Sequence, residues 1–91
     1  MVSPRLERKV RRDFAGSSAD AALARLAALR LALAENQDCE RIQTAVVLLA
    51  AGDDLKLERA ALSAETDWRD VLVWSGLANG DWRARLGELL D

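Results

Sequence analysis

Apolar residues at helical spacing, interrupted at short intervals by glycine or by helix-capping side chains, constrain this chain more than any other feature. Alternation of apolar and polar residues, which is typical of strands, is nearly absent. We therefore expect an all-α protein that folds as a compact irregular or orthogonal bundle of five or six short helices. The expected helices span residues 4–14, 18–35, 39–51, 55–65, 67–75 and 80–90.

Local residue choices predict where these helices begin and end. Ser3 is suited to cap the first helix because Pro4 follows it at the first helical position. Ser17 and Asp20 resemble a capping box for the second helix, with Asp in place of the usual Glu. Gly52 is expected to adopt the left-handed conformation after the third helix. The other expected caps and breaks are Gly16, Asp38, Asp54, Thr66, Gly76, and Asn79 or Gly80.

Each expected helix carries an apolar stripe that predicts its buried side. The helix 18–35 is apolar nearly all round, so it needs neighbours on more than one side. The same holds for 39–51, because Val47 and Leu48 fall outside its main stripe. The predicted inward residues are Leu6, Val10, Phe14, Ala19, Ala22, Leu26, Leu29, Leu33, Ile42, Ala45, Val46, Leu49, Leu55, Leu57, Ala61, Leu62, Trp68, Val71, Leu72, Trp82, Leu86 and Leu89.

The size and composition indicate a single domain over residues 1–91, with a basic amphipathic helix at 1–14 and a helical core at 17–91. With 51% hydrophobic residues and no apolar run long enough for a membrane helix, we expect a cytoplasmic protein that does not bind a membrane. Cys39 is the only cysteine and histidine is absent. These counts exclude an internal disulfide, a typical zinc site and any histidine-based catalytic triad.

The charge is unevenly distributed along the chain. Residues 1–12 carry a net charge of +4, whereas the remainder carries −6. A basic segment on an acidic body can bind nucleic acid or an acidic partner, or it can pack on its own domain with its charges in solvent. The candidate nucleic-acid-binding residues are Arg5, Arg8, Lys9 and Arg12.

The segment 40–82 contains a series of short motifs. They are Arg41-Ile42-Gln43, Ala45-Val46-Val47-Leu48-Leu49-Ala50, Gly52-Asp53, Asp67-Trp68-Arg69-Asp70-Val71-Leu72-Val73 and Gly76-Leu77-Ala78. Together they resemble a group of small, uncharacterised bacterial proteins of actinobacterial type with the pattern ERIQ…AVLxLAxGD…DWRDVLVxAGLA…DW. The chain departs from that pattern at Val47 and Ser75. The resemblance covers about half the chain and implies an all-α fold, but it implies no activity.

Asp67-Trp68-Arg69 and Asp81-Trp82-Arg83 repeat the same three residue types near two expected helix starts. One interpretation is structural: the Asp favours the positive end of the helix, the Trp packs inward and the Arg faces solvent or a carboxylate. The other is a pair of indoles that frames a groove for a partner helix. Trp74 points away from the predicted inward stripe of its helix, which makes it a third candidate. The candidate partner-binding residues are thus Trp68, Trp74, Trp82, Arg69 and Arg83.

The sequence contains no constellation typical of catalysis, and we expect no cofactor and no metal. It favours a non-enzymatic helical module for protein–protein interaction or regulation, with a nucleic-acid-associated regulator as the alternative. A homodimer is also possible through the reverse face of the helix 18–35, where small alanines allow close approach. That face consists of Ala21, Ala24, Ala28, Leu31 and Ala32.

Overall fold

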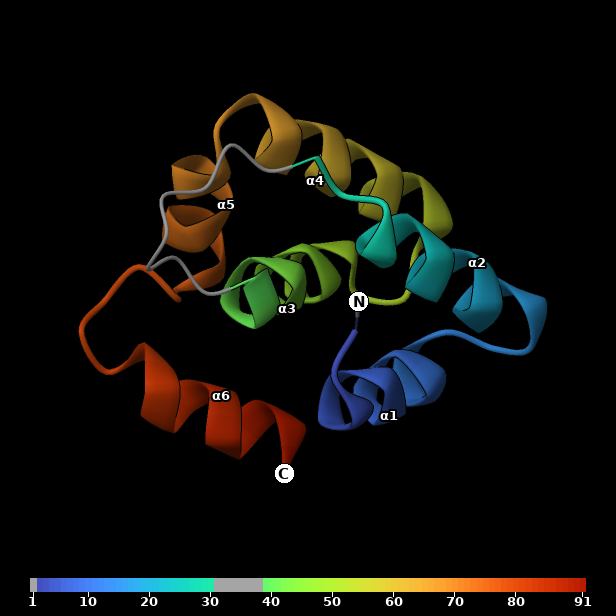
Figure 1. Cartoon of the computed structure of the whole chain (residues 1–91), viewed down its shortest axis with the longest axis horizontal. Helices are drawn as coiled ribbons and strands as arrows, with labels where there is room; N and C mark the ends of the chain where they lie inside the picture. Colours follow the sequence, from blue (N-terminus) through green and yellow to red (C-terminus); the bar gives the residue numbers. More distant parts are fainter. Residues whose placement is uncertain (1, 31–38) are drawn as a thin grey trace.

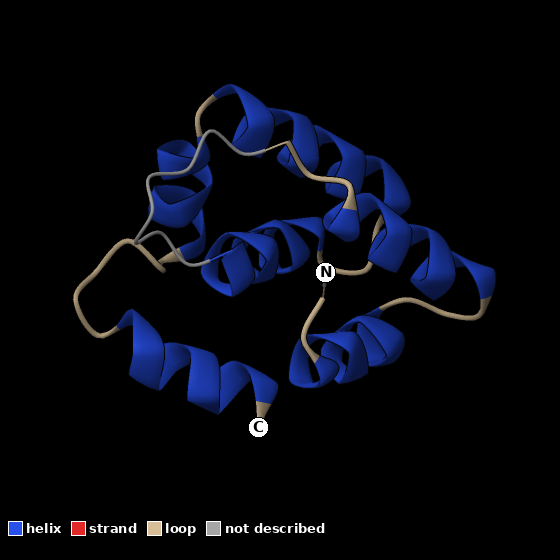
Figure 2. Ribbon diagram, in the orientation of Figure 1, coloured by secondary structure: helices blue, strands red, loops and turns tan. Residues whose placement is uncertain are grey.

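The apolar stripes form six α-helices in the computed structural model, which describes residues 2–30 and 39–91. Helices account for 77% of the described residues, and no strand occurs in these two ranges (Figures 1 and 2). The expected all-α compact bundle is confirmed. The helices are α1 (Pro4–Asp13), α2 (Ser17–Ala27), α3 (Cys39–Ala50), α4 (Asp54–Thr66), α5 (Trp68–Ser75) and α6 (Trp82–Leu90).

Helix α3 lies at the centre of the bundle, and the other helices surround it (Figure 1). It contacts α1, α4, α5 and α6. Because it has neighbours on several sides, it buries residues around most of its circumference, including the polar Gln43 and Thr44. Its buried apolar residues are Ile42, Ala45, Val46, Val47 and Ala50, which confirms that this helix is largely buried.

The basic first helix packs on its own domain. Leu6, Val10 and Phe14 are at most 2% exposed, and α1 contacts α2, α3 and α6. Ser3 caps the helix by accepting a hydrogen bond from the Leu6 N–H at 3.3 Å, and Pro4 occupies the first turn, as expected. The apolar side of α1 is therefore part of the core, and only its charged side faces solvent.

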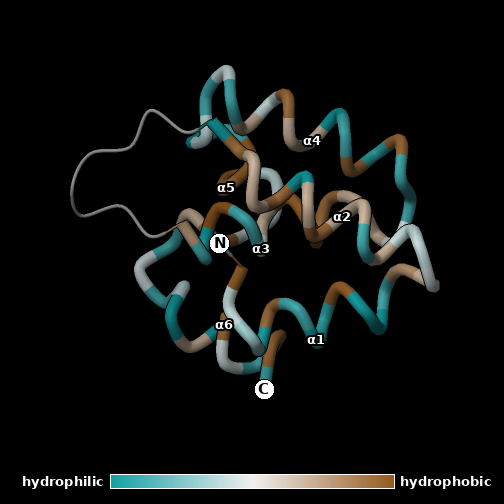
Figure 3. The backbone as a smooth tube through the Cα atoms, turned by 45° about the vertical axis from the view of Figure 1, so that its right-hand side comes forward, coloured by the Kyte–Doolittle hydropathy of each residue, from teal (hydrophilic) through white to brown (hydrophobic). Residues whose placement is uncertain are grey.

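Helix α4 buries a different side from the one expected. The sequence predicts that Leu55 and Leu62 point inward, but they are 62% and 53% exposed. The helix packs instead through Leu57 and three alanines, of which Leu57 and Ala61 are also among the predicted inward residues. The small alanine side chains permit close approach to α2, α3 and α5. These alanines are Ala60, Ala61 and Ala64. Figure 3 shows the resulting alternation of hydrophobic and hydrophilic positions along α4.

The stripes of the remaining helices follow the sequence more closely. The predicted residues Ala19, Ala22 and Leu26 of α2 are buried, as are Val71 and Leu72 of α5. At the end of α6, Leu86 is buried as predicted, but the second buried position is Leu90 rather than Leu89. Leu29, Leu49, Trp68, Trp82 and Leu89 are half-buried and pack against the outside of the core.

The turn between α3 and α4 contains two successive residues in the left-handed region. Gly52 has φ +81°, as predicted, and Ala51 has φ +48°, which the sequence does not indicate. A Cβ atom on Gly52 would lie 2.7 Å from the carbonyl oxygen of Asp13 at the end of α1. Glycine is therefore required at position 52 both for its backbone conformation and for the close approach of two helix ends.

Two of the predicted caps are displaced by one residue. Helix α4 is capped by Asp53 rather than Asp54, and α5 is capped by Asp67 rather than Thr66. Each carboxylate accepts a backbone N–H of the following turn, from Lys56 at 3.0 Å and from Arg69 at 3.1 Å. These bonds lower the pKa of both carboxyl groups, together with the Arg69 side chain in the case of Asp67. Thr66 instead ends α4.

The starts of α2 and α6 also differ from the prediction. The Ser17–Asp20 capping box does not form. The cap position is occupied by Gly16, which has φ +51° and no side chain that could accept a hydrogen bond. Asp20 accepts a hydrogen bond from Arg11 at 3.2 Å instead. Helix α6 begins after Asp81, which makes no side-chain cap bond, rather than after Asn79 or Gly80. Gly76 ends α5 as predicted, and it does so in the left-handed conformation.

Helix α2 is shorter than the predicted helix at 18–35. The Arg30 N–H donates to the Glu65 carboxylate at 2.9 Å instead of extending the helix. Arg25 binds the same carboxylate, with Nη2 and Oε1 separated by 3.0 Å. These hydrogen bonds, first from Arg25 and then from the Arg30 backbone, lower the pKa of Glu65 to about 2. The predictions for Leu31, Ala32, Leu33 and the turn 35–38, including the Asp38 cap, lie outside the described residues.

Candidate partner-binding surface

The large apolar side chains that are mostly exposed in the described residues lie on two neighbouring helices. Leu55 and Leu62 belong to α4, whereas Val73 and Trp74 belong to α5. Val73 is 64% exposed and Trp74 is 60% exposed. Helices α4 and α5 pack against each other, and we call the exposed sides of these two helices, which carry the four side chains, the α4–α5 surface.

A shallow groove of about 290 Å³ lies within this surface. Trp74 lines one side, and Leu49 of α3 and Ala60 of α4 contribute further apolar area. The polar residues that line it are Lys56, Arg59 and Ser63 of α4. Among the described residues, the lining thus combines apolar side chains with two cations and contains no acidic side chain.

Lys56 and Arg59 form no ion pair with any described residue. The acidic residues of α4 are engaged elsewhere, because helical periodicity separates them from this side. Glu58 faces α2, where its carboxylate binds Arg25 at 2.8 Å. The two cations are therefore available to a partner.

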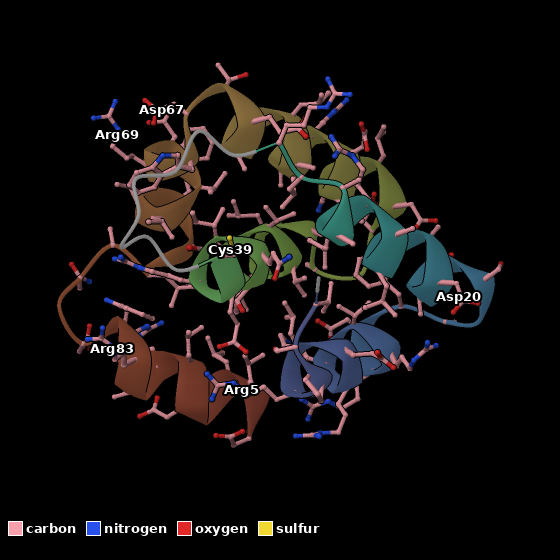
Figure 4. The ribbon with its side chains drawn as sticks, viewed as in Figure 1. Arg5, Asp20, Cys39, Asp67, Arg69 and Arg83 are labelled. Atoms are coloured by element: carbon pink, nitrogen blue, oxygen red, sulfur yellow. The ribbon has the colours of Figure 1, made fainter. Side chains whose placement is uncertain are left out.

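Trp68 lies in a second groove, of about 360 Å³, at the junction of α4 and α5. It is half-buried beside Asp67 and Arg69. Arg69 binds Asp67 with its Nε atom 3.0 Å from Oδ1, and Figure 4 shows the two side chains together at the start of α5. This arrangement follows the structural interpretation of the Asp-Trp-Arg motif, in which the Arg neutralises its own capping carboxylate.

Trp82 is engaged by cations of its own chain. The guanidinium groups of Arg41 and Arg83 each lie 4.6 Å from the centroid of its ring. Arg41 is fixed in addition by a 2.8 Å hydrogen bond from Nε to the Leu77 carbonyl oxygen. Cation–π contacts of this kind stabilise an indole where it lies. Trp82 therefore joins α6 to α3, which is a structural role for the second Asp-Trp-Arg motif.

The three tryptophans do not share one groove. Trp68 and Trp74 line separate grooves, and Trp82 lines neither. Figure 4 shows Arg83 at the start of α6, distant from Arg69 at the start of α5. The two repeated motifs are therefore not the two walls of a common site, and Trp74 is the candidate that lies on the α4–α5 surface.

The candidate nucleic-acid-binding residues of α1 fall into two groups. Arg5 binds the Glu40 carboxylate at 2.6 Å between Nη2 and Oε1, and the Ser3 hydroxyl donates to the same carboxylate. Arg5 lowers the pKa of Glu40. Lys9 pairs with Asp13 at 3.0 Å one turn along the helix. Both cations are thus already neutralised within the fold.

Arg8 and Arg12 form the second group, because neither makes an ion pair with a described residue. They line a groove of about 420 Å³ together with Arg11, Leu90 and Asp91. Arg11 is engaged with Glu7 and Asp20, each at 3.2 Å. The uncompensated basic surface of α1 is therefore limited to two side chains, with a carboxylate beside them.

The remaining candidates carry less information. Ala21 and Ala24 are exposed on α2, and Ala28 is exposed directly after it. Leu31 and Ala32 of the same predicted face lie outside the described residues, so the homodimer stays a prediction. Cys39 is exposed at the start of α3 (Figure 4).

Within residues 2–30 and 39–91, no three acidic or thiol side chains are grouped as metal ligands. None of the described helices is both long enough and apolar enough to cross a membrane.

Comparison of the chain with protein-family models, with curated proteins and with solved structures finds no match. The resemblance to small bacterial helical proteins therefore stays a prediction.

The sequence pattern indicates Trp74 as a candidate but not the residues around it. It predicts Leu55 and Leu62 in the core and gives no signal for Lys56 or Arg59. A helical projection contains the missing signal, because Leu57 and Ala61 lie on the side of the helix opposite Leu55 and Leu62. One side of α4 can be buried by the core, and the alternative side must then face solvent or a partner.

Proposed function

We propose that this protein is a non-enzymatic helical module that binds another protein through the α4–α5 surface. The observation that carries the proposal is the exposure of Leu55, Leu62, Val73 and Trp74 on two adjacent helices. Exposed apolar residues that occur singly are normal on protein surfaces, but a concentration of them is typical of interaction sites.

Trp74 provides the largest apolar side chain of the α4–α5 surface. Covering the exposed 60% of this side chain would remove about 150 Å² of largely apolar area from water, worth roughly 3–4 kcal/mol before ordering costs. Tryptophan is also over-represented among the residues that dominate binding energy. A single anchor of this size supports a specific complex when neighbouring apolar side chains exclude water around it.

Nucleic-acid binding through α1 remains the second candidate, favoured by the unpaired Arg8 and Arg12. It ranks lower because Arg5 and Lys9 are paired with carboxylates of the same chain. The residues after position 12 also carry a net charge of −6, which repels phosphate.

The proposal is tested by site-specific photo-crosslinking in the cells that produce the protein. A photoreactive amino acid replaces Val73 or Leu62, both exposed, and irradiation captures whatever lies against them. We expect discrete adducts of the same partner from both positions. Ala84, exposed on α6, serves as the control position and is expected to give none.

A further position separates the homodimer from the proposed complex. The same photoreactive residue at Ala24 reports on the alanine face of α2, where an adduct with twice the chain mass would indicate the dimer. Absence of adducts at both 62 and 73, or equal labelling at position 84, would contradict the α4–α5 surface as a binding site.

A further inference from the structure

The dimensions of the groove beside Trp74 suit side chains of a polypeptide. Its volume of about 290 Å³ is at the lower limit of pockets that enclose small ligands, and it is shallow rather than enclosed. The lining residues Lys56, Arg59 and Ser63 span two turns of α4, about 10 Å along the helix axis. A partner helix that lies along this groove places apolar residues spaced by three or four against Trp74 and its neighbours.

The charge of the groove restricts which polypeptide can cover it. Lys56 and Arg59 are three residues apart, so they lie side by side on α4. Neither forms an ion pair with a described residue, and none of the described residues that line the groove is acidic. A partner that desolvates these cations without supplying carboxylates leaves buried charges uncompensated, which is costly. Charge complementarity therefore selects an acidic partner.

A second copy of this chain fits the groove poorly. In a symmetric dimer the same patch meets itself, which brings Lys56 and Arg59 of both copies together. The acidic residue nearest in position on α5 is Asp70, one turn before Trp74, and it does not line the groove. Asp53, whose pKa is lowered by the Lys56 N–H bond and by the charges of Lys56 and Arg59, is a single carboxylate beside two cations. Further compensating charge must then come from a different polypeptide.

We propose that the occupant of the groove is an acidic amphipathic helix of a partner protein, which packs apolar side chains on Trp74 and pairs its carboxylates with Lys56 and Arg59. This inference rests on the proposed function, because it specifies the partner of the α4–α5 surface. Apolar contact provides affinity, and the two cations discriminate acidic segments from neutral or basic ones.

A peptide-display selection tests the inference without knowledge of the natural partner. A library of random 16-residue peptides is selected on the intact protein, and peptides that also bind the Trp74→Ser variant are removed. Because Trp74 is exposed, this variant retains the fold. We expect the remaining peptides to carry Asp or Glu beside large apolar residues spaced by three or four.

Charge reversal provides the quantitative test. A synthetic peptide from the enriched pool is expected to bind the Lys56→Glu/Arg59→Glu variant at least tenfold more weakly than the unmodified protein, with the loss diminishing at high salt. Glu at position 56 suits the third position of a helix capped by Asp53, so α4 is preserved.

The matched control is Arg8→Glu/Arg12→Glu. It introduces the same charge change at two unpaired arginines on α1, outside the groove, and it is expected to leave peptide affinity within about twofold.

Three outcomes would overturn the inference. Peptides that depend on Trp74 but are neutral or basic would retain the proposed function and refute the acidic partner. A dimer of the intact protein that is abolished by Trp74→Ser in sedimentation would identify a second copy as the occupant. A pool without any Trp74-dependent peptide would refute the acidic helix, and only the additional absence of crosslinks at positions 62 and 73 would refute the proposed function as well.

Discussion

Replacement of Gly52 by alanine perturbs the junction between α1, α3 and α4 at a single atom. The backbone of Gly52 has φ +81°, where an L residue costs about 1–2 kcal/mol. The added Cβ atom would also lie 2.7 Å from the Asp13 carbonyl oxygen. That oxygen belongs to the backbone and cannot rotate away, so relief requires displacement of a helix end, at about 1–3 kcal/mol. We expect a total loss of about 2–5 kcal/mol in the free energy of unfolding.

Two other glycines separate the two components of this cost. Gly16 has φ +51° but nothing within 4 Å of its Cβ position, so Gly16→Ala is expected to cost about 1 kcal/mol from backbone strain alone. Gly80 has neither a positive φ nor a close neighbour, and Gly80→Ala is expected to be close to neutral.

Urea unfolding followed by circular dichroism at 222 nm gives the three free energies of unfolding from the same kind of curve. We expect the free energy of unfolding to fall most in Gly52→Ala and least in Gly80→Ala. A Gly52→Ala variant that is no less stable than Gly16→Ala would refute the close approach of α1 to the turn after α3.

Three further predictions concern charged residues. The pKa of Glu65 is about 2, below its ordinary value of 4.5, so its stabilising effect is present above pH 4.5 and is lost as the pH falls toward 2. Glu65→Gln is accordingly expected to cost on the order of 1 kcal/mol at pH 6, reduced by solvent screening, and almost nothing at pH 2, as measured by urea unfolding. Arg41→Met removes a cation from Trp82 and a hydrogen bond to a backbone carbonyl, and should cost about 1–2 kcal/mol in the same assay. Gel-shift titration with duplex DNA at low salt is expected to show no complex, whereas a complex lost in Arg8→Glu/Arg12→Glu and at raised salt would establish the second candidate function.

Those parts of the fold that depend on periodicity could be predicted from the sequence. Leu6, Val10 and Phe14 are spaced by four residues, so they lie on one side of a helix, and all three are buried. Gly52 lies just after an apolar helix and adopts the predicted left-handed conformation, and Gly76 ends its helix as predicted. These features depend on neighbours in the chain, so local patterns determine them.

The predictions that are wrong concern segments where long-range contacts compete with local sequence preferences. The predicted helix at 18–35 continues in sequence beyond Ala27, but Glu65 of α4 binds the Arg30 N–H and draws the chain away from the helical path. Asp53 displaces Asp54 as a cap because either carboxylate could serve, and tertiary packing decides which residue is extended. A sequence pattern does not encode the partner of Glu65 or the orientation of α4.

The α4–α5 surface also combines features that local patterns determine with features that depend on long-range packing. The sequence predicts that Trp74 lies outside the inward side of its helix, which consists of Val71 and Leu72, but it leaves open whether a second neighbour buries Trp74. The groove around Trp74 could not be predicted from the sequence, because it depends on how α4 packs beside α5. Lys56 and Arg59 contribute to the groove only through that packing.

Fluorine NMR of the protein labelled with 5-fluorotryptophan tests the central claim most directly. The three tryptophans lie in separate environments, so each resonance can be assigned by substitution. Addition of a concentrated extract of the native cells is expected to shift or broaden the Trp74 resonance while that of Trp82, held by Arg41 and Arg83, stays unchanged. A Trp74 resonance that is identical in buffer and in extract, or a change confined to Trp82, would contradict the α4–α5 surface as the site of partner binding.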